Sequence, residues 1–264
     1  QIQYFKVTQY FFFKQWTELK NYANQKGIQI IGDMPIYVAA DSVEVWTKPE
    51  LFQLDEERNP LFVAGVPADQ FSATGQLWGN PLYAWEEHKK QGYAWWIHRI
   101  EESFKIYDVL RIDHFKGFSD YWQVDGKAEV AKDGSWQPGP GYDLFKAVKE
   151  QLGDLPIIAE DLGNIDDKAR KLLTDCNYPG MKILQFGFED VSGESLDSPH
   201  YCIPHSIVYT GTHDNDVTNG WYNSLTEQQQ QYINDYTHRH EDESICQAMI
   251  RQLFATVSNT AIAT

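Results

Sequence analysis

Residues 109–114 read Val-Leu-Arg-Ile-Asp-His, a short, mostly apolar stretch that ends in two ionisable residues. Short strands with little polar character are typical of parallel sheets whose two faces are both covered by helices. A helical pattern occupies residues 94–107, immediately before this stretch. The stretch therefore predicts a buried parallel strand that follows a helix and carries a carboxylate at its carboxyl end.

The same arrangement recurs along the chain. Further strands are predicted at residues 28–31, 156–159, 181–184 and 206–209, and another is expected to open at residues 261–264. Apolar residues at helical spacing predict helices over residues 12–27, 143–152, 166–174, 226–236 and 243–257. Short buried strands that alternate with amphipathic helices indicate an α/β fold with a parallel sheet.

Two connections are too long for simple loops. Residues 41–88 and residues 120–142 are rich in Gly, Pro and aromatic side chains, and each follows the carboxyl end of a predicted strand. Parallel α/β folds place their active sites at these strand ends. We expect both segments to be insertions that shape a substrate cleft.

The composition excludes some classes of partner. The chain has 264 residues, with 22 Lys+Arg against 38 Asp+Glu and a formal net charge of −16. Nucleic acids and anionic membrane surfaces require clustered basic residues, so neither is expected as a partner. The three cysteines are widely spaced and odd in number, which favours the reducing cytoplasm over a disulfide framework or a zinc site.

Four of the predicted strands end in carboxylates, namely Asp33, Asp113, Glu160 and Asp214. A single acid at a strand end is as often a helix cap or a turn residue as a functional group. Four acids at the same edge of one parallel sheet would converge, and capping explains such a set poorly.

Arg111 and Asp113 lie two residues apart on a predicted strand, so their side chains point to the same face. A guanidinium beside a carboxylate favours its ionised form, which suits a nucleophile. Glu160 follows an apolar run, and partial burial would raise its pKa, which suits a general acid. Cleavage of a glycosidic bond needs such a pair. The alternatives are a structural Arg–Asp pair with a capping Glu, and metal ligation, for which no ligand spacing is present.

Four motifs resemble those of the 4-α-glucanotransferases, also called amylomaltases or disproportionating enzymes, which are distant relatives of the α-amylases. They are Asp-Met-Pro-Ile-Tyr-Val (residues 33–38), Leu-Arg-Ile-Asp-His-Phe-Lys-Gly (110–117), Ile-Ala-Glu-Asp-Leu-Gly (158–163) and Gly-Thr-His-Asp-Asn-Asp (211–216). Residues 65–83 resemble the active-site loop of that family, which general amylases lack. The resemblance covers essentially the whole chain.

The resemblance implies a (β/α)₈ TIM barrel of the amylase type. Only five or six strands are predicted here, and they would be barrel strands three to seven and the start of the eighth, with insertions after the third and fourth. Residues 1–264 are therefore expected to form a partial catalytic barrel domain. Such a chain would close poorly alone, associate with itself through open barrel edges, or be part of a longer protein.

The resemblance also implies the reaction, which is transfer of α-1,4-glucan segments between maltooligosaccharides by a retaining double displacement, with glucose among the products. An α-1,4-glucan hydrolase and a non-catalytic glucan-binding fragment are the alternatives. No cofactor and no metal are expected, because transfer between sugars needs neither redox chemistry nor an activated nucleotide.

By resemblance, Asp113 would be the nucleophile, Glu160 the general acid and base, and Asp214 a third carboxylate that binds the sugar at the cleavage point. The residues that would contact or orient substrate are Arg111, His213, Asp33, Asp69, Gln76, Trp78, Asn80 and Phe186. From the residues alone, Trp78 is better explained as a core anchor and Phe186 as strand core, while His213 fits a structural hydrogen-bonding group as well as a ligand contact.

Overall fold

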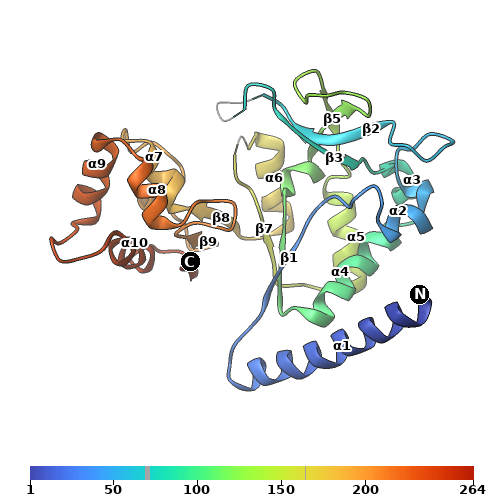
Figure 1. Cartoon of the computed structure of the whole chain (residues 1–264), viewed down its shortest axis with the longest axis horizontal. Helices are drawn as coiled ribbons and strands as arrows, with labels where there is room; N and C mark the ends of the chain where they lie inside the picture. The colour runs from blue at the N-terminus through green and yellow to red at the C-terminus, as the bar shows by residue number, and fades with distance from the viewer. Residues whose placement is uncertain (69–71, 164) are drawn as a thin grey trace. The chain divides into compact units, whose positions relative to one another are not determined.

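The computed structural model describes residues 1–68, 72–163 and 165–264. The chain divides into two compact units, Gln1–Asn177 and Tyr178–Thr264. Each unit contains parallel strands that alternate with helices, as the sequence predicts (Figure 1). In the part of the chain that is described, no helix is both long and apolar enough to cross a membrane.

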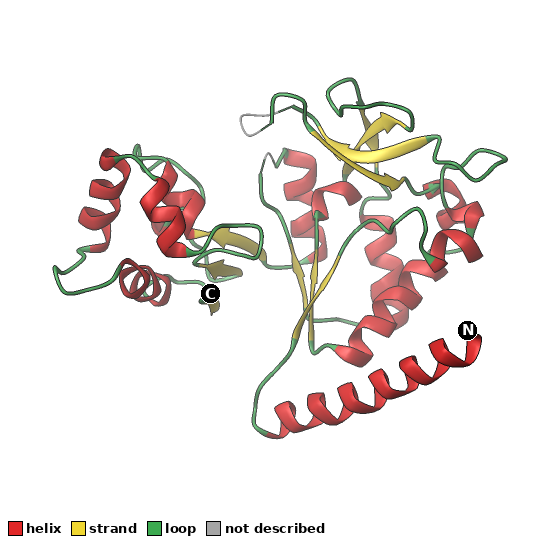
Figure 2. Cartoon of the chain, viewed as in Figure 1, coloured by secondary structure: helices red, strands yellow, loops and turns green. Residues whose placement is uncertain are grey.

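The first unit contains a three-stranded parallel sheet of order β1–β4–β7 (Figure 2). Its strands are β1 (Ile31–Met34), β4 (Val109–Ile112) and β7 (Ile157–Ala159). Strand β4 has the predicted bounds, and both β4 and β7 are almost wholly buried, in agreement with their apolar sequences. The central strand of this sheet is therefore the one that carries Arg111.

Strand β1 begins later than predicted and is less buried. Ile28 is 58% exposed and its N–H donates to the carbonyl of Ala23 at the end of helix α1 (Ile2–Gln25). Residues 28–30 therefore form the connection that leaves the helix, and pairing with β4 starts only at Ile31. Burial then alternates along β1, so the expectation of a strand buried on both faces is wrong here. A Cβ on Gly32 would lie 2.0 Å from Tyr107, so this glycine permits a close approach.

Helices α4 (Ala94–Ile106), α5 (Tyr142–Leu152) and α6 (Asp167–Cys176) support this sheet. Helix α4 contacts β1 and β4, and α5 contacts both α4 and α6. Large aromatic side chains fill the space around α4 and α5: Trp96, Phe118 and Phe145 are fully buried, with Phe118 5.1 Å from each of the other two rings. Much of the high aromatic content of the chain therefore serves the core.

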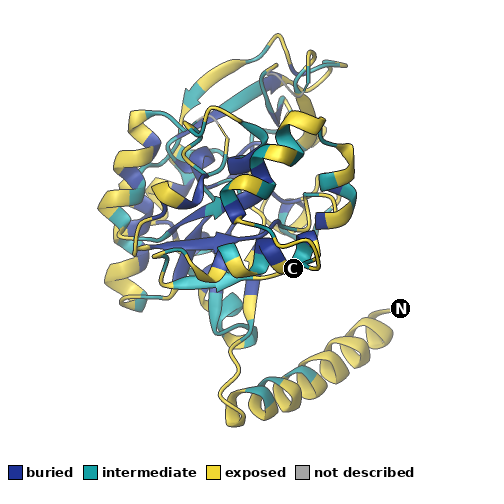
Figure 3. Ribbon diagram, turned by 90° about the vertical axis from the view of Figure 1, so that its left-hand side faces the viewer, coloured by how far each residue is buried: buried dark blue, intermediate teal, exposed yellow. Residues whose placement is uncertain are grey.

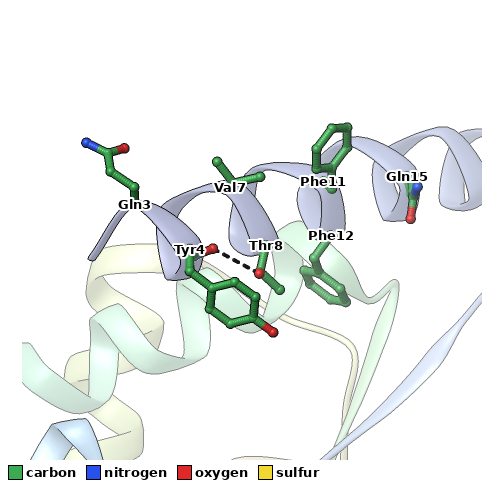
Figure 4. A pocket seen from close by; sticks show the side chains of 7 residues that line it. All are labelled: Gln3, Tyr4, Val7, Thr8, Phe11, Phe12 and Gln15. Atoms are coloured by element: carbon green, nitrogen blue, oxygen red, sulfur yellow. Dashed lines mark hydrogen bonds between the residues drawn. The ribbon is translucent and has the colours of Figure 1, made fainter. Parts of the chain in front are cut away.

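Helix α1 differs from the others because none of its residues is buried, and Figure 3 shows it exposed along nearly its whole length. Trp16 Nε1 donates to the carbonyl of Ile106 (2.7 Å) and Lys20 Nζ to that of Tyr107 (2.8 Å), which fixes the second half of the helix. The first half carries an apolar groove of about 650 Å³ (Figure 4), lined by Gln3, Tyr4, Val7, Thr8, Phe11, Phe12 and Gln15.

The two predicted insertions form one structure. Strands β2 (Phe62–Val66) and β3 (Gln76–Pro81) come from the first, and β5 (Asp120–Asp125) and β6 (Ser135–Pro138) from the second. They pair as a single antiparallel sheet of order β3–β2–β5–β6. The β2–β5 pairing joins the insertions, so the segments expected as two separate additions share one sheet. The short helices α2 (Val43–Thr47), η1 (Pro49–Leu51), α3 (Trp85–Lys90) and η2 (Phe115–Phe118) complete the first unit.

The second unit contains a three-stranded parallel sheet of order β10–β9–β8. Its strands are β8 (Gly180–Ile183), β9 (Ser206–Tyr209) and β10 (Thr260–Ile262), close to the predicted positions. Its helices are α7 (Leu184–Glu189), η3 (Pro199–Tyr201), α8 (Thr218–Ser224), α9 (Glu227–Thr237) and α10 (Ile245–Phe254). A capping box of Thr226 and Gln229 starts α9.

Candidate active site

The parallel sheet of the first unit brings three of the predicted acids to one edge. Asp33 lies on β1, Asp113 directly follows β4 and Glu160 directly follows β7. The carboxyl ends of parallel strands meet at the same edge of a sheet, where enzymes of this fold class carry their catalytic groups. The convergence that the sequence predicts is therefore present for these three residues.

Arg111 connects two of these acids. Its Nη1 donates to both carboxylate oxygens of Asp33, at 2.6 and 2.7 Å, and to Oδ1 of Asp113 at 3.0 Å. Burial disfavours the charged guanidinium, but the hydrogen bond to Asp33 and the charges of Asp33 and Asp113 outweigh it, so the pKa of Arg111 is raised. The charged guanidinium of Arg111 therefore lies against the Asp113 carboxylate, and such a neighbour favours the ionised form of a carboxyl group.

Glu160 is in the opposite electrostatic environment. Burial of the side chain raises its pKa to about 7, and the negative charge of Asp113 acts in the same direction. The N–H of Leu162 donates to Oε1 at 2.7 Å, the N–H of His114 donates to Oε2 at 2.8 Å, and both bonds favour the ionised form. The charge of Arg111 also lowers this pKa. Because burial dominates, Glu160 can exchange a proton near neutral pH.

His114 links the strand that carries Asp113 to the segment that carries Glu160. Its backbone is in the left-handed region (φ 47°, ψ 51°), a conformation uncommon for residues other than glycine. This turn directs the His114 N–H to the Glu160 carboxylate, while the N–H of Phe115 donates to the Glu160 carbonyl at 3.0 Å. Burial lowers the pKa of the His114 ring to about 4, so the ring is neutral at physiological pH.

Of the predicted loop residues in segment 41–88, Trp78 lies beside His114. The Trp78 ring contacts the His114 ring edge to face at 4.9 Å and lies 6.2 Å from that of Tyr37. It is 36% exposed, so it is not a buried core anchor. Trp78 Nε1 donates to the side chain of Gln76 (3.1 Å), and Asn80 Nδ2 donates to a backbone carbonyl in the loop after β1 (3.0 Å).

The same loop, residues 65–83, also contains Asp69 and the glycines Gly75 and Gly79. Asp69, a predicted substrate contact, lies outside the described residues. Gly75 and Gly79 flank the Trp78 segment, and both have positive φ (70° and 78°), a conformation that glycine adopts without strain. A Cβ on Gly75 would lie 2.4 Å from the carbonyl oxygen of Val66, so a larger residue could not close this turn.

The remaining predicted residues, His213, Asp214 and Phe186, belong to the second unit. His213 and Asp214 follow β9 in an exposed turn, with Nε2 of His213 3.5 Å from Oδ2 of Asp214 and side chains 68% and 69% exposed. Phe186 lies on helix α7 and is partly exposed, so its interpretation as strand core is wrong. The turn is held by Asn215, whose side-chain oxygen accepts from the N–H and the hydroxyl of Thr212.

Several residues that contact this site were not singled out from the sequence. His114 and Leu162 supply the N–H groups that bind Glu160, and Lys116 binds acids on two further segments. All three residues lie inside the sequence motifs at residues 110–117 and 158–163. Membership of a motif was the one sequence feature that pointed to them. Their roles depend on backbone direction and burial, which a motif does not reveal.

One group of described residues has the donor atoms to share a metal ion. Among the described residues, the group whose donor atoms could share an ion is His98, Glu101 and Glu102, which lie within 4.8 Å of one another on the surface of α4. Exposed acidic groups of this kind are common without an ion. The chemistry available at the sheet edge is that of two carboxyl groups, Asp113 beside the charged Arg111 and Glu160 with its pKa raised to about 7.

Comparison with known proteins gives one consistent result. The family model described as 4-alpha-glucanotransferase matches residues 1–264. A 4-alpha-glucanotransferase of Streptococcus pneumoniae is 53% identical over 100% of this chain and 52% of its own length. The enzyme of Clostridium butyricum is 45% identical over 99% of this chain and 54% of its own length. The chain thus spans about half the length of the curated relatives that it matches.

Solved structures agree with this match. An amylomaltase from Streptococcus agalactiae, solved in complex with acarbose, superposes with a TM-score of 0.97 at 60% sequence identity. The match covers 99% of this chain and 53% of the amylomaltase chain. An amylomaltase from Corynebacterium glutamicum shares the fold at 15% identity, with a TM-score of 0.76 over 95% of this chain and 40% of its own.

Proposed function

Because the chain belongs to the 4-alpha-glucanotransferase family, we propose that the complete protein transfers α-1,4-glucan segments between maltooligosaccharides with retention of configuration. The observation that carries this proposal is the pair formed by Asp113, tied to Arg111 at 3.0 Å, and Glu160, whose pKa is raised to about 7. One carboxylate is poised as a nucleophile and the other as a proton donor, as a retaining mechanism requires.

In the proposed first step, the Asp113 carboxylate attacks the anomeric carbon while the glycosidic C–O bond breaks. Glu160 donates its proton to the departing oxygen, which leaves a glucosyl ester on Asp113 and an ionised Glu160. In the second step, Glu160 takes the proton from the 4-hydroxyl of an acceptor sugar, whose oxygen displaces Asp113. The new bond has the original configuration because each displacement inverts the anomeric carbon.

The other predicted residues are proposed to bind and orient the glucan. Asp214 and His213 would bind hydroxyls of the sugar at the cleavage point, together with Asp33, which also holds Arg111 in place. The remaining proposed substrate contacts are Asp69, Gln76, Trp78, Asn80 and Phe186. The partly exposed Trp78 ring beside His114 supports a stacking role at the cleft.

The two parallel sheets are proposed to be segments of one amylase-type (β/α)₈ barrel, with residues 41–88 and 120–142 inserted after its third and fourth strands. The parallel order of each sheet supports this arrangement. Among the described residues, the outer strands of both parallel sheets each pair with a single neighbouring strand. We therefore also propose self-association of this chain through open edges.

The proposed ligands are α-1,4-glucans, maltooligosaccharides and glucose, in line with the acarbose bound to the Streptococcus agalactiae protein. Nucleic acid, membrane and cofactor play no part in the proposed reaction. The proposed place of action is the cytoplasm, in starch, glycogen or maltose metabolism, which the free state of Cys176, Cys202 and Cys246 supports.

The products of maltotriose distinguish the candidate functions. The complete protein is incubated with maltotriose, and the products are separated by anion-exchange chromatography. The transferase yields glucose together with maltooligosaccharides longer than the substrate. Shorter sugars with new reducing ends alone would identify a hydrolase, and binding of acarbose without any product would identify a non-catalytic glucan-binding protein.

A further inference from the structure

Lys116 is a buried lysine on η2, three residues after Asp113. Its Nζ donates to Oδ1 of Asp120 and, at 3.2 Å, to Oδ2 of Asp166, and it lies 4.3 Å from the centre of the Trp136 ring. A buried charge is costly unless it is paired. The two carboxylates and the aromatic face therefore determine where this ammonium group lies.

The partners of Lys116 belong to different parts of the first unit. Asp120 is the first residue of β5 and Trp136 lies on β6, so both are in the inserted sheet. Asp166 is the N-cap of α6, and its second oxygen accepts from the N–H of Ala169 at 2.9 Å. Lys116 therefore connects η2, the inserted sheet and the start of α6.

Two of these connections lead to Glu160. Its carboxylate accepts one N–H from His114 and one from Leu162. Lys116 follows His114 by two residues, and Asp166 follows Leu162 by four. The Lys116–Asp166 ion pair thus joins the segment that contains His114 to the segment that contains Leu162. In each segment the ion-pair residue lies C-terminal to the residue whose N–H binds Glu160.

We infer that Lys116 is a positioning residue for the proton donor of the proposed reaction: by joining the segments that contain His114 and Leu162, it keeps both backbone N–H groups directed at Glu160. This inference rests on the proposed function of Glu160. Lys116 acts through the backbone of its neighbours and is not itself a reacting group.

Positioning of the N–H donors by Lys116 can be distinguished from a direct effect of its charge on the pKa of Glu160. Asp113 and Arg111 are the charged groups that act on Glu160 most strongly, in opposite directions. Lys116 acts on the ring of His114, whose pKa it lowers. Loss of the N–H bonds would raise the pKa of Glu160, because these bonds favour its ionised form.

Asp166→Asn is the decisive variant. Asparagine caps a helix as well as aspartate does, but it removes the ion pair with Lys116. If Asp166 acted on Glu160 only through space, loss of its negative charge would lower the pKa of Glu160. If the ion pair positions the N–H donors, its loss raises that pKa. The two explanations therefore predict shifts of opposite sign.

The pKa of Glu160 is measured in the complete protein by ¹³C NMR titration of carboxyl-labelled glutamate, with the signal assigned from Glu160→Gln. We expect Lys116→Met and Asp166→Asn each to raise it by about one unit, and Lys116→Arg to restore the wild-type value. The matched control is Lys146→Met, which removes an exposed lysine paired with Glu150 on α5 at 3.9 Å and is expected to leave the titration unchanged.

The same variants are assayed with maltotriose. Displacement of a catalytic group by about 1 Å costs on the order of 10²-fold in rate, so we expect Lys116→Met to lower kcat by about that factor with a much smaller change in KM. An unchanged or lowered pKa of Glu160 in Asp166→Asn would overturn the inference. If Lys116→Met does not fold, Asp166→Asn and Lys116→Arg still decide it.

The titration does not depend on turnover. A wild-type protein that forms no longer maltooligosaccharides would refute the proposed transferase function, while the Glu160 titration would still report on Lys116. The two failures are therefore distinguishable.

Discussion

Asp33 and Arg111 face each other across the β1–β4 pair, and both carboxylate oxygens of Asp33 accept from Nη1 of Arg111 at 2.6 and 2.7 Å. The strand register places these residues opposite one another although they are 78 positions apart. Asp33 is therefore a partner of the arginine that holds Asp113, in addition to its proposed contact with sugar.

Replacement of Asp33 tests this relationship. We expect Asp33→Asn to lower kcat/KM by about tenfold, because loss of one charged hydrogen-bond partner costs about 1.5–3 kcal/mol and leaves Arg111 free to move from Asp113. Thermal unfolding should show a loss of about 1–2 kcal/mol, since Asp33 is partly exposed. The control is the exposed Asp41→Asn. Equal activity of the two variants would show that Asp33 has no such role.

Asp113 is the proposed nucleophile. We expect Asp113→Asn in the complete protein to lower turnover of maltotriose by about 10³-fold or more, because an amide cannot form the ester intermediate. Circular dichroism and thermal unfolding should remain close to those of the wild type, and the exposed Asp133→Asn serves as the control. Near-normal turnover would show that another residue attacks the sugar.

The pH dependence of the rate follows from Glu160. The first step needs the protonated carboxyl group, so the rate of that step should fall as pH rises through about 7, the pKa of Glu160. A donor that needs no protonation, such as α-maltosyl fluoride, should lose this decline when fluoride release is measured. The same decline with both donors would assign the titration to a different group.

Glu160 should also make stability depend on pH. Its pKa rises from the ordinary 4.5 to about 7 in the folded protein, so the unfolded chain ionises first as pH increases. Glu160 therefore costs no stability below pH 4.5, and the cost grows to its full value, about 3 kcal/mol, above pH 7.

Urea unfolding of Glu160→Gln measures this cost, because the amide does not titrate. Relative to the wild type, the variant should gain stability between pH 4.5 and 7. A difference between the two proteins that is constant with pH would contradict the raised pKa. Glu150→Gln, on the exposed side of α5, provides a matched control.

The apolar first half of α1 should drive self-association of the 264-residue chain. Tyr4 and Phe11 are 69% and 51% exposed, and an apolar surface of this extent is unusual for a monomer. Both side chains line the apolar groove drawn in Figure 4. We expect light scattering to give a mass above that of one chain, and Tyr4→Glu with Phe11→Glu to reduce it. Lys14→Glu on the same helix is the control, and a monomeric wild type would refute the proposal.

Some of this structure follows from local sequence. The buried strands Val109–Ile112 and Ser206–Tyr209 have the predicted bounds, because a short run with little polar character is typical of a strand covered on both faces. The capping box at Thr226 is likewise a local hydrogen-bond pattern. The prediction at residues 28–31 is wrong because the end of a helix and the pairing with β4, rather than the apolar run itself, set the start of β1.

The sequence by itself determined the alternation of strands and helices, the acids at strand ends and the motifs that indicate the family, since each depends on residues close together in the chain. The tertiary structure decided the pairing of β2 and β3 with β5 and β6 in one sheet, the ion pair of Asp33 with Arg111 and the enclosure of Lys116. It also decided the raised pKa of Glu160. These properties arise from burial and from contacts between segments far apart in the chain, which only folding brings together.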